Sequence, residues 1–137
     1  MENYFHLRLP EDTLRGISSI GLAHLGDAVY ELLVRSYLCA QGRATGKGLH
    51  RSAVELVRAE AQSQRAERIL PLLTEEELHV FKRGRNAHVH TIPHSASRSE
   101  YLRATALECL LGHLYLTGQT DRINQLFCAM MEETPCP

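Results

Sequence analysis

The stretch that decides the fold is LAHLGDAVYELLV, residues 22–34. Its apolar residues recur at the spacing of one helical face: Leu22, Leu25, Val29, Leu32 and Leu33. The pattern predicts a helix that begins after Ser18 or Ser19, either of which can cap it, and ends near Leu38. Because this helix is apolar on most sides, we expect it to lie at the centre of the domain.

Asp27 is the exception in this helix. An ionised carboxylate among apolar side chains is costly unless it is paired or bound to a cation. The neighbouring Gly26 weakens the helix by roughly 1 kcal/mol relative to alanine, and it permits another backbone to approach closely. Glu31 lies one turn further on and can share a face with Asp27. From this helix alone, a buried ion pair with an arginine and a cation site both stay open.

A second stretch, ATALECLLGHLYL at residues 104–116, repeats the anomaly. It carries one strong apolar stripe, formed by Leu107, Leu110, Leu111 and Leu114. Glu108 is again a lone acid among apolar residues. If Asp27 and Glu108 meet, they offer the few carboxylates that Mg²⁺ takes together with water and phosphate oxygens. Such a site suits phosphodiester hydrolysis.

The rest of the chain also carries helical signals. Further helices are predicted over residues 49–70, from Thr74 to Arg83, over 99–116, and from Thr120 to Met131. Thr74 and Glu77 form a capping box, and Gly84 is predicted as the helix stop. Residues 85–99 contain Pro93 and lack periodicity, which predicts an exposed loop. Strand signals are nearly absent, so we expect one all-α domain over residues 1–137, with its core at about 18–132.

Composition narrows the class of protein. The 137 residues are 44% hydrophobic and 23% charged, which is ordinary for a globular domain. The four cysteines form no CxxC pair, so a zinc site of that kind has no support. The first ten residues lack the apolar segment of a signal peptide, and no apolar run approaches the roughly 20 residues of a membrane helix. We therefore expect a cytoplasmic protein with no membrane association.

The net charge of −1 hides a basic segment between His79 and Arg103. This segment contains five lysines and arginines but only one acid, Glu100. A near-neutral protein can still present one basic face to a phosphate backbone. The candidate RNA-binding residues are Lys82, Arg83, Arg85, Asn86, His88 and Arg98. A solvated loop is the alternative, and the histidines of this segment fit no zinc-ligand spacing.

Several short motifs, in order, resemble a known family. LGDAVYE at residues 25–31 resembles the signature helix of ribonuclease III, and residues 104–116 look like the second helix of that family. RGRNA at 83–87 is similar to a segment of the Mini-ribonuclease III branch, as are LHR at 49–51 and TEEE at 74–77. The resemblance implies a ribonuclease III endonuclease-domain-like helical bundle. It also implies a chain without the double-stranded-RNA-binding domain that larger relatives add.

The resemblance implies roles for particular residues. Asp27 matches the catalytic, metal-linked aspartate, and Glu108 matches the metal-binding glutamate. Ala23 and Thr105 stand where larger family members carry two further acids, which is the thinner set of the Mini branch. Glu31 has no implied chemical role, and a structural ion pair is its default interpretation.

The resemblance also implies a reaction and its partners. The expected activity is Mg²⁺-dependent hydrolysis of double-stranded or structured RNA, with Mn²⁺ as a possible substitute. The products would carry 5′-phosphate ends. A homodimer would cut precursor large-subunit (23S) ribosomal RNA, with a ribosomal protein as a possible presenter of the substrate. The catalytic domain itself would have to grip the duplex.

Two alternatives stay open at this point. The reduced set of acids is also consistent with a non-catalytic RNA-binding or ribosome-assembly module on the same fold. A helical dimerisation protein without nucleic acid, with both acids in ion pairs, is a second alternative. Cleavage of long double-stranded RNA with Mg²⁺ or with EDTA separates the first alternative from the enzyme. RNA affinity at low salt separates the second.

Overall fold

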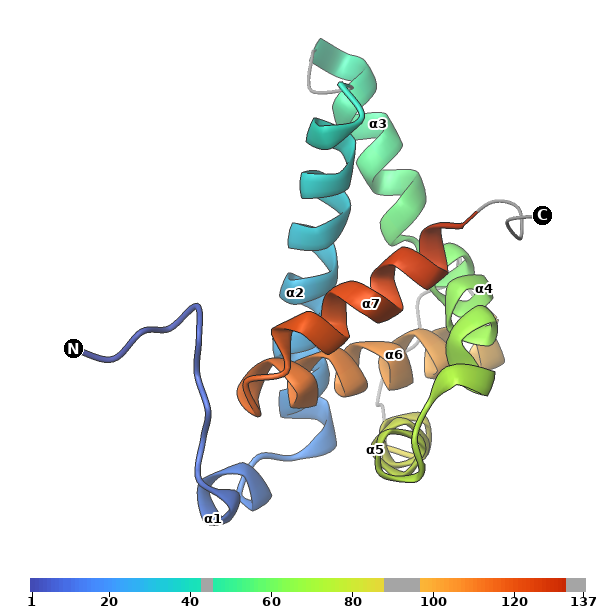
Figure 1. Cartoon of the computed structure of the whole chain (residues 1–137). Helices are drawn as coiled ribbons and strands as arrows, with labels where there is room; N and C mark the ends of the chain where they lie inside the picture. The colour runs from blue at the N-terminus through green and yellow to red at the C-terminus, as the bar shows by residue number, and fades with distance from the viewer. Residues whose placement is uncertain (43–45, 88–96, 133–137) are drawn as a thin grey trace.

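The computed structural model describes residues 1–42, 46–87 and 97–132, and the part it describes is helical (Figure 1). The helices are α1 (Glu11–Arg15), α2 (Ser19–Ala40), α3 (Gly46–Val57), α4 (Ala59–Ile69), the 3₁₀ turn η1 (Leu70–Leu72), α5 (Glu75–Arg85), α6 (Arg98–Leu116) and α7 (Thr120–Met131). Within these residues there is no strand, only an isolated bridge between Arg8 and Thr117. The predicted all-α class is confirmed. None of the described helices has the length and apolar character to cross a membrane.

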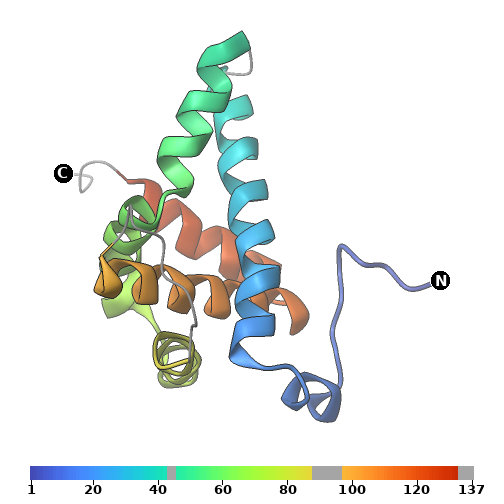
Figure 2. The same ribbon diagram turned by 180° about the vertical axis from the view of Figure 1, so that it is seen from behind.

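Helix α6 lies at the centre, with α2, α4, α5 and α7 packed around it (Figures 1 and 2). Its predicted apolar stripe is fully buried: Leu107, Leu110, Leu111 and Leu114 are each 0% exposed. Helix α2 adds Tyr30, Val34 and Leu38 to the same core. Burial of a large apolar side chain contributes about 1.5–3 kcal/mol, so these side chains supply much of the driving force for folding.

Two glycines let α2 and α6 touch backbone to backbone. A Cβ atom on Gly26 would overlap the carbonyl oxygen of Glu108, and one on Gly112 would overlap the carbonyl oxygen of Leu22. The helix-weakening glycine predicted to admit another backbone does so. Because Asp27 follows Gly26 directly, this contact brings Asp27 and Glu108 to the same crossing point.

The prediction of a single helix over residues 49–70 is wrong, because the structure has two helices there. Helix α3 ends at Val57 and α4 begins at Ala59, with Arg58 between them in an extended conformation (φ −62°, ψ 147°). Helix α3 runs beside α2, and these two helices project beyond the others in both views (Figures 1 and 2).

Two side-chain hydrogen bonds satisfy the last carbonyl groups of α3 at the break. The Tyr30 hydroxyl donates to the carbonyl oxygen of Leu56 (2.8 Å), and the Gln62 side-chain amide donates to that of Val57 (2.8 Å). Carbonyl groups at a helix end need such partners when they are withdrawn from water. The Tyr30 hydroxyl cannot be recognised as a donor from helical periodicity, and this explains the error.

Helix α5 has the predicted capping box but not the predicted end. The Thr74 hydroxyl accepts from the backbone of Glu77, whose carboxylate accepts from the backbone of Thr74. Gly84 is not a stop, because α5 continues to Arg85 and buries Gly84 against α6. A Cβ atom on Gly84 would lie 2.6 Å from the Cβ atom of Cys109. This glycine serves close helix packing instead.

Two other boundaries also differ from the sequence prediction, and two short elements were missed. Helix α3 begins at Gly46, three residues before the predicted start. Helix α6 begins at Arg98, one residue early, because the Ser97 hydroxyl accepts from the backbone of Glu100. Helix α1 and the turn η1 were not predicted, since both are too short to show a periodic pattern. Most of the predicted 85–99 loop lies outside the described residues, as does the C-terminal tail.

Replacing Gly26 with alanine should separate α2 from α6. The added methyl group has no room beside the Glu108 carbonyl, so we expect the free energy of unfolding to fall by about 3 kcal/mol or more. Urea denaturation followed by circular dichroism measures this loss. Gly48→Ala in α3 is the matched control, because a Cβ atom there meets open space. It should leave stability unchanged or raise it by up to about 1 kcal/mol. Equal effects of both substitutions would contradict the close-contact role of Gly26.

The free energy of unfolding should depend on pH through Glu77. Its side chain is buried and pairs with Arg122 (2.8 Å), and this hydrogen bond, ahead of the cap at Thr74, lowers its pKa below the ordinary 4.5. A lowered pKa contributes stability above pH 4.5 that is lost as the pH falls through the lowered value. Glu77→Gln should cost about 1–3 kcal/mol at neutral pH and flatten the decline below pH 4.5. Urea denaturation at neutral pH and below pH 4.5 tests this, with Glu75→Gln at an exposed position as the control. If the stability of Glu77→Gln falls with acid as steeply as that of the wild type, the pair of Glu77 with Arg122 is not the source of the decline.

Candidate active site

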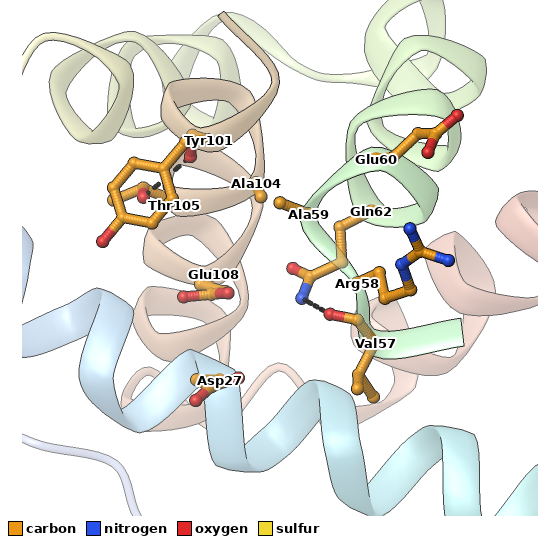
Figure 3. A pocket seen from close by; sticks show the side chains of 10 residues that line it. All are labelled: Asp27, Val57, Arg58, Ala59, Glu60, Gln62, Tyr101, Ala104, Thr105 and Glu108. Atoms are coloured by element: carbon orange, nitrogen blue, oxygen red, sulfur yellow. Dashed lines mark hydrogen bonds between the residues drawn. The ribbon is translucent and has the colours of Figure 1, made fainter. Parts of the chain in front are cut away.

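Asp27 and Glu108 line the same cleft, which has a volume of about 250 Å³ (Figure 3). Asp27 comes from α2, Glu108 from α6, and the opposite wall comes from the break between α3 and α4. The lining residues are Asp27, Val57, Arg58, Ala59, Glu60, Gln62, Tyr101, Ala104, Thr105 and Glu108. The two lone acids of the sequence therefore meet, although they are 81 positions apart (108 − 27).

The cleft disfavours the charged form of Glu108. Burial, followed by the charge of Asp27, raises the pKa of Glu108 to about 8. The pKa of the more exposed Asp27 is also raised, by partial burial and by Glu31, against the lowering effect of His24. Each of the two carboxyl groups therefore lies where its charged form is disfavoured.

Neither acid has a cationic partner among the described residues, whose ion pairs all lie elsewhere. This observation goes against the ion-pair explanation of Asp27. Two carboxylates brought together without neutralisation disfavour each other, and a divalent cation would relieve that repulsion.

Gln62 contributes the third oxygen that faces the acids. Its side chain is 3% exposed, and its amide nitrogen is held by the carbonyl of Val57. Its Oε1 atom has no hydrogen-bond partner in the described structure, and the carboxamide points toward Glu108 (Figure 3). Carboxylate and carboxamide oxygens are the ligand types that Mg²⁺ and Mn²⁺ accept, so the donor set fits a hard cation.

Ala23 and Thr105 stand where larger family members carry two further acids, and neither residue offers a free ligand oxygen in their place. Ala23 is buried in the core, 5% exposed. Thr105 lines the cleft, but its hydroxyl donates to the backbone carbonyl of Tyr101 (2.9 Å). Glu60 also lines the cleft, and its carboxylate points away from Glu108 (Figure 3). No group of three histidine, cysteine or acidic ligands occurs in the described ranges.

Comparison with known proteins identifies the fold and the family. A ribonuclease III domain matches residues 21–119. A Mini-ribonuclease 3 of Symbiobacterium thermophilum is 44% identical over 108 residues, which cover 79% of this chain and 83% of that protein. One of Enterococcus faecalis is 41% identical, with coverage of 80% and 85%. The chain belongs to the Mini-ribonuclease 3 family.

The structural comparison agrees. The crystal structure of a Fusobacterium nucleatum protein superposes with a TM-score of 0.79 at 33% identity, covering 87% of this chain and 95% of the other. As a member of the Mini-ribonuclease 3 family, the protein is a hydrolytic endoribonuclease. Ribonuclease III enzymes act on double-stranded RNA, work as dimers and generally depend on divalent metal ions.

The predicted RNA-binding residues that the structure describes lie outside the cleft of this ribonuclease. Lys82, Arg83, Arg85 and Asn86 are exposed at the end of α5, and Arg98 is exposed at the start of α6. None of them lines the cleft; Arg83 instead lines a separate hollow with Arg8, Arg15 and His113. His88 lies outside the described residues, as do His90 and His94.

Arg103, from the same basic segment, has a structural role. Its guanidinium donates to Ser63 (3.0 Å) and pairs with Glu67 (2.5 Å), which ties α6 to α4. Glu31 forms the expected ion pair, with Arg35 one turn further along α2 (2.5 Å).

Among the cleft residues that sequence reasoning missed, Arg58 and Gln62 are the candidates for a functional role. Arg58 is exposed at the α3–α4 break, the one basic side chain among the described residues of the cleft wall. It could not be found, because the break itself was not predicted. Gln62 did leave a signal: it shares the buried face of α4 with Ala66 and Ile69, where a polar side chain is unexpected.

Proposed function

We propose that this ribonuclease cuts double-stranded RNA with Mg²⁺ bound by Asp27 and Glu108, and that Mn²⁺ can substitute. The observation that carries the proposal is the meeting of two carboxylates, without a cationic partner among the described residues, in one open cleft. An orphaned buried oxygen on Gln62 beside them supports it. The proposed products carry 5′-phosphate and 3′-hydroxyl ends, as in the ribonuclease III family.

The residues of the cleft divide the work. Exposed Asp27 can reach the phosphodiester group, whereas the deeper Glu108 anchors the site within the helix crossing. Arg58 offers a positive charge to the phosphate at the rim. A divalent cation held by Asp27 and Glu108 would supply Lewis acidity and would activate a water molecule. The chain's own contribution is to hold both carboxylates at the helix crossing.

Removing either charge should abolish cleavage and spare the fold. Asp27→Asn and Glu108→Gln nearly keep side-chain shape, but each removes a charge that is worth several kcal/mol to a metal-assisted reaction. We expect cleavage of long double-stranded RNA to fall at least about 1000-fold, which corresponds to about 4 kcal/mol. The melting temperature without metal should stay the same or rise, because the repulsion in the cleft is relieved.

Single-turnover cleavage assays with Mg²⁺ and with EDTA measure this effect. Glu55→Gln is a matched control, since Glu55 is exposed on α3 and does not line the cleft. Wild-type rates in a folded Asp27 or Glu108 variant would refute the assignment. RNA binding without any metal-dependent cleavage by the wild type would favour the non-catalytic alternative.

We also propose that the basic residues at the end of α5 and the start of α6 hold the RNA. Their exposure leaves Lys82, Arg83, Arg85 and Arg98 free to meet phosphates. Asn86 and His88 would add polar contacts. Duplex RNA is recognised mostly through its shape, phosphates and 2′-hydroxyl groups, so such a surface needs no base-specific pocket.

The salt dependence of RNA binding tests this surface. Replacing Arg83, Arg85 and Arg98 together by glutamine should weaken the affinity of the protein for RNA, measured without metal so that no cleavage occurs. The slope of log K against log salt should become shallower by roughly one for each phosphate group that the protein no longer neutralises. The melting temperature should barely move, because all three side chains are exposed. Arg35→Gln on α2 is the control; an unchanged slope in the triple variant would locate the RNA elsewhere.

We propose, further, that the chain forms a homodimer in which each subunit cuts one strand. Several large apolar side chains remain exposed on the single chain, among them Leu32 at 57%. A hollow between α2 and α7 is lined by Leu33, Tyr37, Phe127 and Met131. Exposed apolar surface of this kind is typical of subunit interfaces, and a two-fold dimer is the commonest assembly.

Sedimentation equilibrium at micromolar concentration should give about twice the 15.4 kDa mass of the chain. Leu32→Lys should shift the equilibrium toward the monomer, whereas Glu55→Lys should not, because Glu55 is already polar and exposed. An active monomer would remove the paired-site arrangement.

The proposed substrate in the cell is precursor large-subunit (23S) ribosomal RNA, as the Mini branch of the family implies. A ribosomal protein that presents the RNA would supply the sequence selectivity that a shape-reading surface lacks. The proposed catalytic domain comprises residues 1–137.

A further inference from the structure

Gln62 occupies a position that packing alone does not explain. It is 3% exposed on the face of α4 that also buries Ala66 and Ile69. Polar side chains are rare at such depth unless their hydrogen bonds are satisfied. Half of this carboxamide is satisfied, because its nitrogen donates to the carbonyl oxygen of Val57 (2.8 Å). The other half, Oε1, has no partner among the described residues.

The hydrogen bond to Val57 also fixes which way the carboxamide points. Rotating the amide by half a turn would bring Oε1 against the Val57 carbonyl oxygen and leave two acceptors facing each other. The nitrogen therefore stays on Val57, and the oxygen stays on the cleft side with Glu108 and Asp27 (Figure 3). The fold holds a buried, uncharged acceptor at the point where the two acids converge.

We propose that Gln62 Oε1 is a third protein ligand of the cation held by Asp27 and Glu108. This inference rests on the proposed function. Amide oxygens bind hard divalent cations alongside carboxylates. The two positions that carry further acids in larger family members hold Ala23 and Thr105, so a neutral oxygen from α4 completes a site that is short of ligands.

The competing explanation is that Gln62 is purely structural. Its amide caps the end of α3, and loss of that hydrogen bond alone destabilises the break between α3 and α4. A useful experiment therefore compares variants that lose the amide donor equally but differ in the oxygen. Gln62→Leu and Gln62→Glu meet this requirement, since neither donates to Val57 and only the second keeps an oxygen.

Manganese affinity of the whole chain, without RNA, is the direct measurement. Free Mn²⁺ is counted by electron paramagnetic resonance during titration. We expect Gln62→Leu to weaken binding by about 10-fold or more, as loss of a supporting polar group at a metal site does. Gln62→Glu, which keeps an oxygen, should bind more tightly than Gln62→Leu. Wild-type Mn²⁺ affinity in folded Gln62→Leu would overturn the proposal and leave only the structural role.

Terbium luminescence gives a second measurement that does not depend on affinity. Lifetimes in H₂O and D₂O count the water molecules on the bound ion, and Gln62→Leu should show one more than the wild type. An equal count in both proteins would also overturn the proposal. If the leucine variant does not fold, Gln62→Met takes its place with the same expectations, because it keeps the chain length and lacks the oxygen.

Asp27→Asn and Glu108→Gln separate this inference from the proposed function. If the wild type binds Mn²⁺ and both of these variants lose it, the metal site stands, and the Gln62 variants decide the third ligand. If the wild type binds no Mn²⁺, the proposed function and the inference fail together. Loss of affinity on Gln62→Leu, with a gained water, supports both.

Discussion

The backbone contact between α2 and α6 is the constraint on which the rest of this structure depends. Gly26 and Gly112 each face a carbonyl oxygen of the opposite helix, with no room for a side chain. A crossing this close fixes both the relative rotation and the position of the two helices along each other. Asp27 and Glu108 are attached directly to that crossing. Their separation is therefore set by helix packing rather than by flexible side-chain contacts, and this is the preorganisation that a catalytic metal site requires.

The same contact has an energetic cost. Close packing pulls Glu108 into the interior beside Asp27, and its pKa of about 8 records how poorly the folded chain tolerates a second negative charge there. The fold tolerates this cost because the leucine stripe of α6 is fully buried and stabilises the helix crossing. A site built at the strongest part of the core can hold unfavourable charges in place, which a surface loop cannot do.

The two acids could be predicted because their signals are local. A carboxylate inside an otherwise apolar helix stands out from its immediate neighbours, and a glycine beside it indicates close contact. The division of residues 46–69 into α3 and α4 could not be predicted, because it depends on a distant donor, Tyr30, which lies 26 residues from its acceptor. The misassigned role of Gly84 has a similar cause: at the sequence level, a glycine after two basic residues looks like a helix end, and only the contact with Cys109 reveals a packing position.

The electrostatics of the cleft favour a neutral third oxygen over a third acid. Thr105 precedes Glu108 by one helical turn, so a carboxylate at that position would lie beside one whose pKa is already raised. Each additional acid must release its proton before it can bind a cation, and competition with protons weakens metal binding at neutral pH. A carboxamide oxygen avoids this competition, since it has no proton to lose and adds no repulsion. The Gln62 nitrogen is held by the carbonyl oxygen of Val57, which lies at the break between α3 and α4. The break therefore also fixes the orientation of the Gln62 oxygen, Oε1.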